Sequence, residues 1–223
     1  MERPGVSERG VRAAMSIFQS PVRDTAVLFD LDGVIADSFD VWVAVLAECR
    51  ARRNLPPLSV LEVQRSWGQG IVADCETFFP SASPAVLARE YDDAFERRVE
   101  QVRAVPGSAE LIQRLHEQGA TLAVVTNSPV RMARAVLEAL GVESRFDAVC
   151  GGDEVELGKP DPELVSLALR RLGSSPKAAV MIGDTALDVR AARAAGVRAV
   201  GLGVDGDLRV EHLSELIELL TSR

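Results

Sequence analysis

Apolar residues recur along this chain in two patterns, as short continuous runs and at helical spacing, and the two patterns alternate. The continuous runs predict buried β-strands, which cover residues 27–29, 121–126, 146–150, 178–182 and 198–202. The helical spacing predicts helices that mostly stop at a glycine, over residues 108–118, 130–140, 162–172, 186–195 and 211–220. This alternation predicts an α/β fold built on a parallel sheet.

One stretch breaks the alternation, because the residues that follow Ser38 carry helical patterns and no β-rich run. The expected helices cover residues 39–53, 60–67, 71–79 and 84–102, with proline or glycine breaks between them. We therefore expect a small helical unit inserted after the first strand. The predicted organisation is a flexible N-terminal tail (1–22), a core (23–38 and 105–223) and a helical cap (39–104). Met15 is an alternative start, so residues 1–14 need not belong to the mature protein.

Composition narrows the classes of function. The net charge of −8 argues against binding to nucleic acid or to an anionic membrane surface. No apolar stretch is long enough to cross a bilayer. The three cysteines, Cys49, Cys75 and Cys150, form no Cys-x-x-Cys pair. Free thiols in a reducing compartment are therefore expected, which indicates a cytoplasmic protein.

Polar residues gather where the predicted strands end. Asp30 and Asp32 close the first strand, and because residues i and i+2 of a strand point the same way, both can reach one site. Two neighbouring acids repel each other unless a cation lies between them. The next strand ends at Thr126 and Asn127, and the fourth at Asp184. In parallel sheets the ligand crevice lies at this edge, so we expect these groups to share a site.

Each of these groups also has an ordinary structural explanation. Asp-x-Asp-Gly after a strand can be a simple turn, Thr126 or Asp184 can cap a helix, and Lys159 can be an exposed loop charge. Several such groups at one sheet edge are harder to attribute to capping alone. Lysine usage points the same way, because Lys159 and Lys177 are the only lysines among 25 basic residues. A compact ammonium suits a tight carboxylate and phosphate site.

Four segments in order resemble the motifs of the haloacid dehalogenase-like (HAD) hydrolase superfamily. They are Asp30-Leu-Asp-Gly-Val-Ile-Ala-Asp-Ser38, Thr126-Asn-Ser, Lys159-Pro-Asp-Pro and Gly183-Asp-Thr-Ala-Leu-Asp188, and the match spans residues 27 to about 203. The helical insert resembles the small (C1-type) cap of the phosphoglycolate phosphatase and β-phosphoglucomutase relatives. The resemblance implies a Rossmann-like core and a Mg²⁺-dependent phosphatase that acts on a small phosphorylated metabolite, as a monomer or homodimer.

The resemblance also implies roles for the motif residues. Asp30 would be the nucleophile that forms an aspartyl-phosphate, and Asp32 the general acid and base. Mg²⁺, a hard cation suited to oxygen ligands, would be held by Asp30, the Asp32 carbonyl and Asp184. Asp188 would support the metal or its waters. The phosphoryl oxygens would be bound by Thr126, Asn127 and Lys159.

The same resemblance separates the branches of the superfamily. True dehalogenases lack the second acid, which is present here as Asp32. Phosphonatases need a cap lysine, and residues 39–104 contain none. The β-phosphoglucomutase branch has a histidine twelve residues after its nucleophile, where this chain has Trp42. Hydrolysis of a phosphomonoester is therefore expected, with a phosphosugar mutase as the alternative.

Two non-enzymatic alternatives remain. Receiver domains also combine a phospho-accepting aspartate, acidic Mg²⁺ ligands and a lysine, but their acceptor ends the third strand, where this chain has Cys150-Gly-Gly-Asp153, and they lack a cap. The second alternative is a catalytically silent relative that acts as an interaction module. The intact motifs argue against this alternative.

The cap is expected to choose the substrate. Arg65, Trp67 and Gln69 lie where capped relatives place their specificity loop. Arg65 would bind a second anionic group, Trp67 would stack on a ring, and Gln69 would bind hydroxyls. The alternative is that Trp67 belongs to the cap core and Arg65 is solvated. Phosphoglycolate, a sugar or aminosugar phosphate and an intermediate of specialised metabolism all remain open as substrates.

Overall fold

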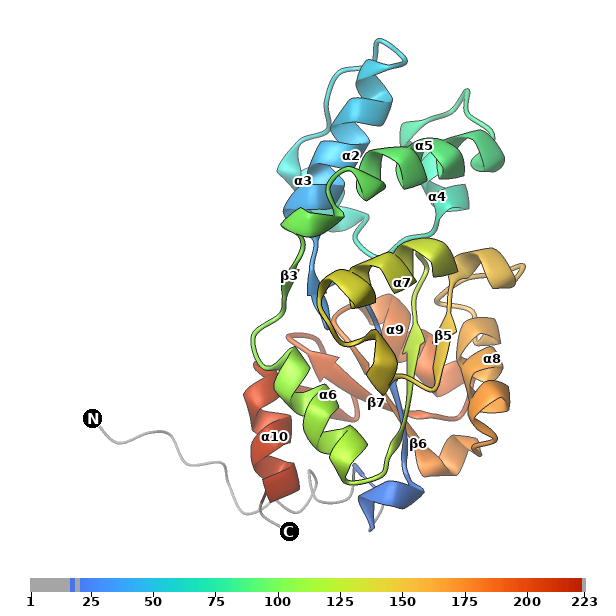
Figure 1. Cartoon of the computed structure of the whole chain (residues 1–223). Coiled ribbons are helices and arrows are strands. Elements are labelled where there is room, and N and C mark those ends of the chain that lie inside the picture. The colour runs from blue at the N-terminus through green and yellow to red at the C-terminus, as the bar shows by residue number, and fades with distance from the viewer. Residues whose placement is uncertain (1–16, 19–20, 222–223) are drawn as a thin grey trace.

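The computed structural model describes residues 17–18 and 21–221, in which an α/β core carries a helical cap at one end (Figure 1). The core helices are α6 (Ser108–Glu117), α7 (Val130–Ala139), α8 (Glu163–Leu172), α9 (Ala186–Ala194) and α10 (Leu213–Thr221). The core strands are β1 (Ala26–Phe29), β4 (Thr121–Val125), β5 (Ala148–Cys150), β6 (Ala179–Gly183), β7 (Arg198–Leu202) and β8 (Leu208–Val210). The cap holds α2 (Phe39–Ala51), α3 (Val60–Arg65), α4 (Ile71–Phe78) and α5 (Pro84–Glu96).

The six core strands form one sheet in the order β5-β4-β1-β6-β7-β8, and every neighbouring pair is parallel. The predicted α/β fold with a parallel sheet is thereby confirmed. Strand β1 lies in the interior of the sheet, with Phe29 opposite Val124 of β4 and Ile182 of β6. Because these strands run in one direction, the residues that follow β1, β4 and β6 emerge at the same edge.

Helices cover both faces of the sheet (Figure 1). Alternate residues of β1 point to opposite faces, so Val27 and Phe29 pack into one hydrophobic cluster while Ala26 and Leu28 pack into the other. The first cluster includes buried residues of α6, α7 and α10, and the second those of α8 and α9. Burial on both faces explains why the strands read as continuous apolar runs.

The cap follows β1 in the chain and returns to the core through two short strands. Strands β2 (Ala36–Asp37) and β3 (Arg103–Ala104) pair antiparallel where the chain leaves and re-enters the core. The ring of Trp42 on α2 lies 5.4 Å from that of Tyr91 and 5.2 Å from that of Phe95, both on α5. These rings belong to the same hydrophobic cluster as β1, so apolar packing continues from the sheet into the cap.

The structure differs from the predicted elements in a few places. The helix expected over 84–102 ends at Glu96 and is followed by the 3₁₀ turn Val99–Gln101, because the chain must straighten to form β3. Strands β2, β3 and β8 were not predicted, since they have only two or three residues and no apolar alternation can show in so short a run. Further 3₁₀ turns are Val22–Asp24, Glu143–Arg145, Gly152–Glu154 and Pro176–Ala178.

The end of the predicted N-terminal tail is part of the core. Ile17 and Phe18 are only 4% and 2% exposed, and Val22 is also buried in the first hydrophobic cluster. The expectation of a flexible tail as far as residue 22 is therefore wrong for these three residues, because their apolar side chains are covered by the core. The rest of that expectation concerns residues 1–16 and 19–20, which lie outside the described part of the chain, and Pro21, which is exposed.

Two further expectations can be compared with the structure. Cys49, Cys75 and Cys150 are all buried free thiols, as predicted. Among residues 17–18 and 21–221, no helix combines the length and the apolar character needed to cross a membrane.

Candidate active site

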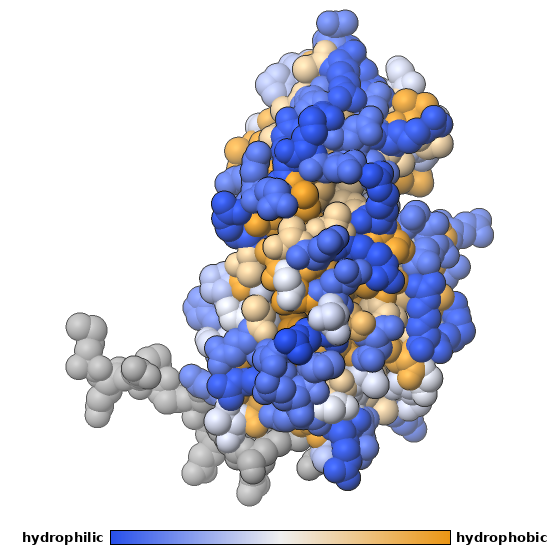
Figure 2. Space-filling view, viewed as in Figure 1, coloured by the Kyte–Doolittle hydropathy of each residue, from blue (hydrophilic) through white to orange (hydrophobic). Residues whose placement is uncertain are grey.

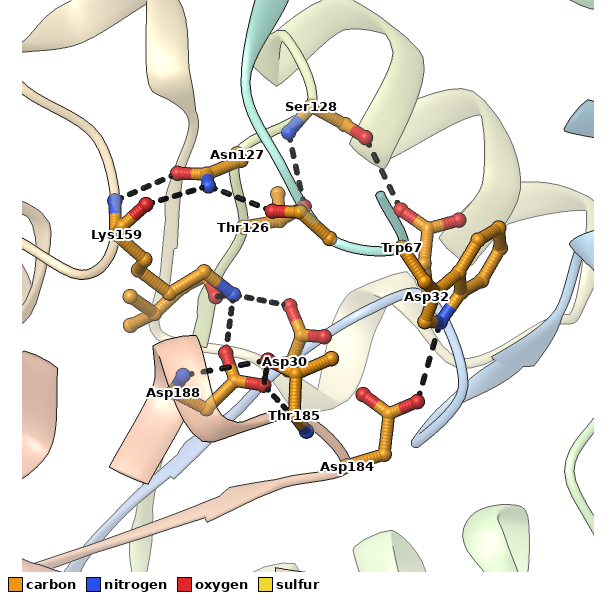
Figure 3. A network of polar contacts seen from close by, with 12 residues as sticks. Asp30, Asp32, Trp67, Thr126, Asn127, Ser128, Lys159, Asp184, Thr185 and Asp188 are labelled. Carbon is orange, nitrogen blue, oxygen red and sulfur yellow. Dashed lines mark hydrogen bonds and ion pairs between the residues drawn. The ribbon is translucent and has the colours of Figure 1, made fainter. Parts of the chain in front are cut away.

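Asp30 lies at the carboxyl end of β1, where its side chain is buried beside Lys159 (Figure 3). The Lys159 ammonium lies 2.5 Å from Asp30 Oδ1 and 2.6 Å from Asp188 Oδ1, and it also donates to the Val125 carbonyl at 3.0 Å. Burial alone would lower the pKa of Lys159, but the charges of Asp188 and Asp30 outweigh it and raise that pKa. Lys159 is therefore a fixed cation, not an exposed loop charge.

Asp184 and Asp188 complete a buried acidic cluster with Asp30. One carboxylate oxygen of each lies within 4.8 Å of the others. Burial, reinforced by Asp188, raises the pKa of Asp30 well above its ordinary value, and the same two causes raise the pKa of Asp184 to about 7. Asp184 Oδ1 is buried without a hydrogen-bond partner. Three converging oxygens, one of them unpaired, suit a hard divalent cation such as Mg²⁺.

Two glycines leave room for these carboxylates. A Cβ atom on Gly33 would lie 2.0 Å from Asp184 Oδ2, and one on Gly183 would lie 2.2 Å from the Asp188 Cβ. Gly33 also has a φ of +90°, a conformation that other residues rarely adopt. The glycine of the Asp-x-Asp-Gly segment is thus needed for the approach of the acidic cluster as well as for the turn.

Asp32 points away from the acidic cluster and toward the cap. Its Oδ1 accepts hydrogen bonds from Ser38 Oγ (2.5 Å) and Trp42 Nε1 (3.1 Å), and its Oδ2 accepts one from Ser128 Oγ (3.0 Å). These donors come from the cap entrance, helix α2 and the loop after β4. Asp30 and Asp32 are therefore held in different surroundings, as two carboxylates with different roles require. The expected metal contact of the Asp32 carbonyl stays a prediction.

The loop after β4 connects the core motifs with the cap. Thr126 Oγ1 accepts from the Ser128 N–H at 3.0 Å. The Asn127 side chain donates to the carbonyls of Gly68 (2.8 Å) and Lys159 (3.0 Å), and it accepts from the Lys159 N–H at 2.8 Å. Asn127 thus holds the loop of Lys159 and the cap loop together, in addition to lying beside the expected phosphoryl site.

A cavity lies beside these motifs, at the junction of core and cap, where hydrophobic surface appears in Figure 2. Residues of both parts line it: Asp30, Asp32, Thr126, Asn127 and Lys159 from the core, and Trp42, Trp67, Gln69, Asp74 and Tyr91 from the cap. Trp67 Nε1 donates to Asp184 Oδ2 at 3.2 Å, so a cap residue contacts the acidic cluster directly. The cap therefore closes over the site.

The structure separates the three cap residues singled out from the sequence. Trp67 and Gln69 line the cavity that contains Asp30, whereas Arg65 is exposed and lines a second hollow, which Gln69 also borders. Trp67 also packs on Phe39, with ring centroids 5.1 Å apart. Its expected roles in the cap core and at the substrate site are thus compatible.

Sequence reasoning did not identify Trp42, Asp74 and Tyr91 as lining residues. Trp42 was noted only as a departure from the mutase pattern. Asp74 could have been noticed, because it lies on the helix face that also carries Ile71, Cys75 and Phe78, where the spacing predicts an apolar residue. Tyr91 carries no comparable signal.

Comparison with known families and proteins agrees with the geometry. Residues 27–202 match the family described as haloacid dehalogenase-like hydrolase. The chain is 32% identical over 216 residues to an N-acetylmuramic acid 6-phosphate phosphatase of Pseudomonas aeruginosa, covering 89% of this chain and 96% of that protein. It is 34% identical over 182 residues to a phosphoglycolate phosphatase of Caulobacter vibrioides, covering 78% of this chain and 77% of that protein.

Solved structures share the fold, cap included. A hydrolase from Pseudomonas syringae superposes with a TM-score of 0.77 at 29% identity, covering 89% of this chain and 98% of that one. A β-phosphoglucomutase from Clostridium difficile gives a TM-score of 0.77 at 19% identity, covering 88% and 97%. The second likeness concerns the fold alone, because the identity is low.

Proposed function

This chain belongs to the haloacid dehalogenase-like hydrolase family as one of its phosphatases, and from that premise we propose that it hydrolyses a small phosphomonoester through an aspartyl-phosphate on Asp30. The observation that carries the proposal is the Asp30 carboxylate, buried at the floor of the cavity with the Lys159 ammonium 2.5 Å away. An anionic substrate needs positive charge at its phosphoryl group, and Lys159 supplies it on the side of the nucleophile.

The reaction divides between the two first-motif carboxylates. An Asp30 oxygen attacks phosphorus while the bond from phosphorus to the alcohol oxygen breaks, and Asp32 donates its proton to the departing oxygen. A water then attacks the phosphorus of the aspartyl-phosphate, and Asp32 takes its proton, so that phosphate leaves and both carboxylates are restored. The donors to Asp32 from Ser38, Trp42 and Ser128 fix its orientation toward the cavity.

The acidic cluster fits a Mg²⁺ ion. Asp30 and Asp184 would hold the ion, with Asp188 beside them, and Asp184 Oδ1 has no hydrogen-bond partner among the described residues. Bound Mg²⁺ would supply the charge that lets an anionic phosphoryl group approach three carboxylates. Asp188 has two further tasks, since it binds Lys159 and accepts from the N–H of Thr185 at the start of α9.

The physiological setting follows from simpler observations. Every residue of the site belongs to one chain, which is compatible with a monomer or a homodimer. Three free cysteines suit a reducing compartment, and we place the enzyme in the cytoplasm. Trp42 occupies the position of the mutase histidine and donates to Asp32, so we favour hydrolysis over phosphosugar transfer.

A panel of phosphomonoesters assayed with Mg²⁺ tests the proposal. The wild type should release phosphate from p-nitrophenyl phosphate and from some panel members, and EDTA should stop it. Asp30→Asn should lower turnover by at least about a thousandfold, because an amide is no nucleophile. Asp32→Asn should be nearly as harmful, whereas Asp37→Asn, an exposed control on β2, should leave turnover unchanged. An Asp30→Asn variant with near-normal turnover would contradict the assignment of the nucleophile.

A further inference from the structure

A carboxylate of the cap faces the cavity away from the catalytic cluster. Asp74 lies on the buried face of α4 with Cys75 and Phe78, and it lines the same cavity as Asp30. Its Oδ1 accepts from Gln69 Nε2 at 2.6 Å and its Oδ2 from the Tyr91 hydroxyl at 2.9 Å. An ionised carboxylate has about four acceptor positions, so both oxygens keep capacity for a donor on a ligand.

Both oxygens of Asp74 accept a hydrogen bond, an arrangement that favours the ionised carboxylate. Desolvation raises its pKa to about 6, and the hydrogen bonds from Gln69 and Tyr91 oppose the shift. Neither partner brings a positive charge, so within the described part of the chain these hydrogen bonds leave the negative charge of Asp74 unneutralised. The wall of the cavity formed by the cap therefore presents an anion.

The cations near the cavity do not offset this charge. Among the described residues that line it, Lys159 is the one basic side chain, and its ammonium is already bound by Asp30, Asp188 and the Val125 carbonyl. Arg65 lines the second hollow instead. An acidic group at the cap end of a substrate would therefore meet Asp74 with no cation to balance it.

We propose that the cap wall selects phosphomonoesters of a non-acidic alcohol that bears hydroxyl or amino donors, with Asp74 as the accepting residue. The inference rests on the proposed function and names the substrate class of the same site. The rings of Trp42 and Tyr91 beside Asp74 offer an apolar surface to the carbon skeleton, as in sites that bind polyols or sugars. Phosphoglycolate and N-acetylmuramic acid 6-phosphate, which name the relatives' activities, both carry a carboxylate in their alcohol part and fall outside this class.

Matched pairs of esters test the inference directly. The pairs are 2-hydroxyethyl phosphate against 2-phosphoglycolate, and N-acetylglucosamine 6-phosphate against N-acetylmuramic acid 6-phosphate. A carboxylate replaces a hydroxymethyl group in the first pair, and a carboxylate-bearing lactyl ether replaces one hydroxyl in the second. For the wild type we expect kcat/KM to be at least about tenfold higher for the non-acidic member of whichever pair is hydrolysed, which corresponds to about 1.4 kcal/mol.

Asp74→Asn should reduce this ratio to within about threefold, because the amide keeps the shape of the side chain and removes its charge. Asp93→Asn makes the same chemical change on the exposed side of α5 and should leave the ratio as in the wild type. Circular dichroism establishes that each variant is folded. If Asp74→Asn does not fold, Asp74→Ser takes its place, and the wild-type ratio alone still decides.

The outcomes separate the inference from the function on which it rests. A wild type that prefers the acidic member of either pair, or a ratio that Asp74→Asn leaves unchanged, overturns the inference while hydrolysis itself stands. The same holds if hydrolysis of an acidic ester depends on Arg65. No phosphate release from any ester, p-nitrophenyl phosphate included, contradicts the proposed function and the inference together.

Discussion

Asp32 illustrates how single residues of this site are placed by distant parts of the chain. Its two carboxylate oxygens accept from Ser38, Trp42 and Ser128, and the last of these lies 96 positions away in the sequence. A carboxylate held by three donors has little rotational freedom, so it stays aimed at the cavity. Asp30, by contrast, is oriented by one cation and by the acidic cluster. Two chemically equal residues thus lie in different surroundings, as the proposed division of roles between them requires.

The carboxylate of Asp74 should make the stability of the protein depend on pH. Its pKa is about 6 in the folded chain against an ordinary value of 3.8. An acid whose pKa is higher in the folded than in the unfolded chain stabilises the folded state at low pH. This contribution is lost as the pH rises through 6. Between pH 4 and pH 7 the wild type should therefore lose ~2 kcal/mol of unfolding free energy more than Asp74→Asn does.

Urea denaturation of both proteins at constant Mg²⁺ concentration, repeated across that pH range, measures the difference. Asp93→Asn, whose side chain is exposed, should follow the wild-type curve. Parallel curves for wild type and Asp74→Asn would show that Asp74 is not a buried acid.

Among the elements, those with long apolar patterns could be predicted from the sequence. Of the strands with two or three residues, β5 was predicted within the run 146–150, whereas the others were not. Helices α6 to α9 begin and end within a few residues of the predicted bounds, because a glycine follows each apolar stretch. Strands β1, β4 and β6 also lie within one residue of their predicted bounds, because each is a continuous apolar run. Their ends place Asp30, Thr126 and Asp184 at one edge of the sheet. Strands β2, β3 and β8 are too short to leave a pattern.

The cap shows the second limit of sequence reasoning. Its helices were predicted, but their packing brings together residues whose spacing carries no signal, such as Trp67 with Asp184 and Gln69 with Asp74. The position of Arg65 beside the second hollow was not predictable either, because Arg65 ends the short helix α3 and its surroundings depend on how the cap helices pack. The chemistry of the core was thus accessible from four motifs, while the chemistry of the cap needed the tertiary structure.

The loop between α3 and α4 is a cap segment that forms hydrogen bonds with the core. Trp67 donates to Asp184, and the Gly68 carbonyl accepts from Asn127. Contacts with the remote part of a substrate raise kcat/KM when they hold the phosphoryl group in line with the nucleophile. Trp67→Ala and Gln69→Ala should therefore lower kcat/KM for the best ester of the panel by roughly ten- to a hundredfold.

Arg65→Ala is the matched control for this loop, and it should change kcat/KM by less than about twofold, because its exposed side chain lines the other hollow. The loss in the two variants should be smaller for p-nitrophenyl phosphate, which offers the cap little to contact. Equal losses on both esters would mean that the loop supports the fold and does not select the substrate.

For the molecule as a whole, the core extends to residues that precede the first strand. Ile17 and Phe18 are almost fully buried, so replacing either by alanine should cost about 2–5 kcal/mol of unfolding free energy. Deletion of residues 1–14, which show no periodic apolar face in the sequence, should leave the melting temperature within about 2 °C of the wild type. Thermal unfolding of the three proteins distinguishes these cases, and a destabilised deletion variant would show that the preceding residues also pack on the core.

The acidic cluster links the stability of the whole molecule to the proposed metal. Burial and the charge of Asp188 raise the pKa of Asp184 to about 7, so above that pH an ionised Asp184 opposes folding unless a cation is bound. This penalty is absent at low pH and grows as the pH rises from 4 to 7. Asp184→Asn removes it, so at pH 8 in EDTA the variant should melt at least about 3 °C above the wild type.

Addition of Mg²⁺ should reverse this order. A cation that binds only the folded state at a hundred times its dissociation constant stabilises it by about 2.7 kcal/mol, which raises the wild-type melting temperature by roughly 5–10 °C. Asp184→Asn should gain less than half of that shift, since a ligand carboxylate is lost. Asp205→Asn removes the same charge from a side chain that is 96% exposed and should respond to Mg²⁺ as the wild type does. If Asp184→Asn gained the full shift, the metal would have to lie elsewhere. A cluster that destabilises the fold without a bound cation is the expected cost of holding three carboxylates at the proposed phosphoryl site.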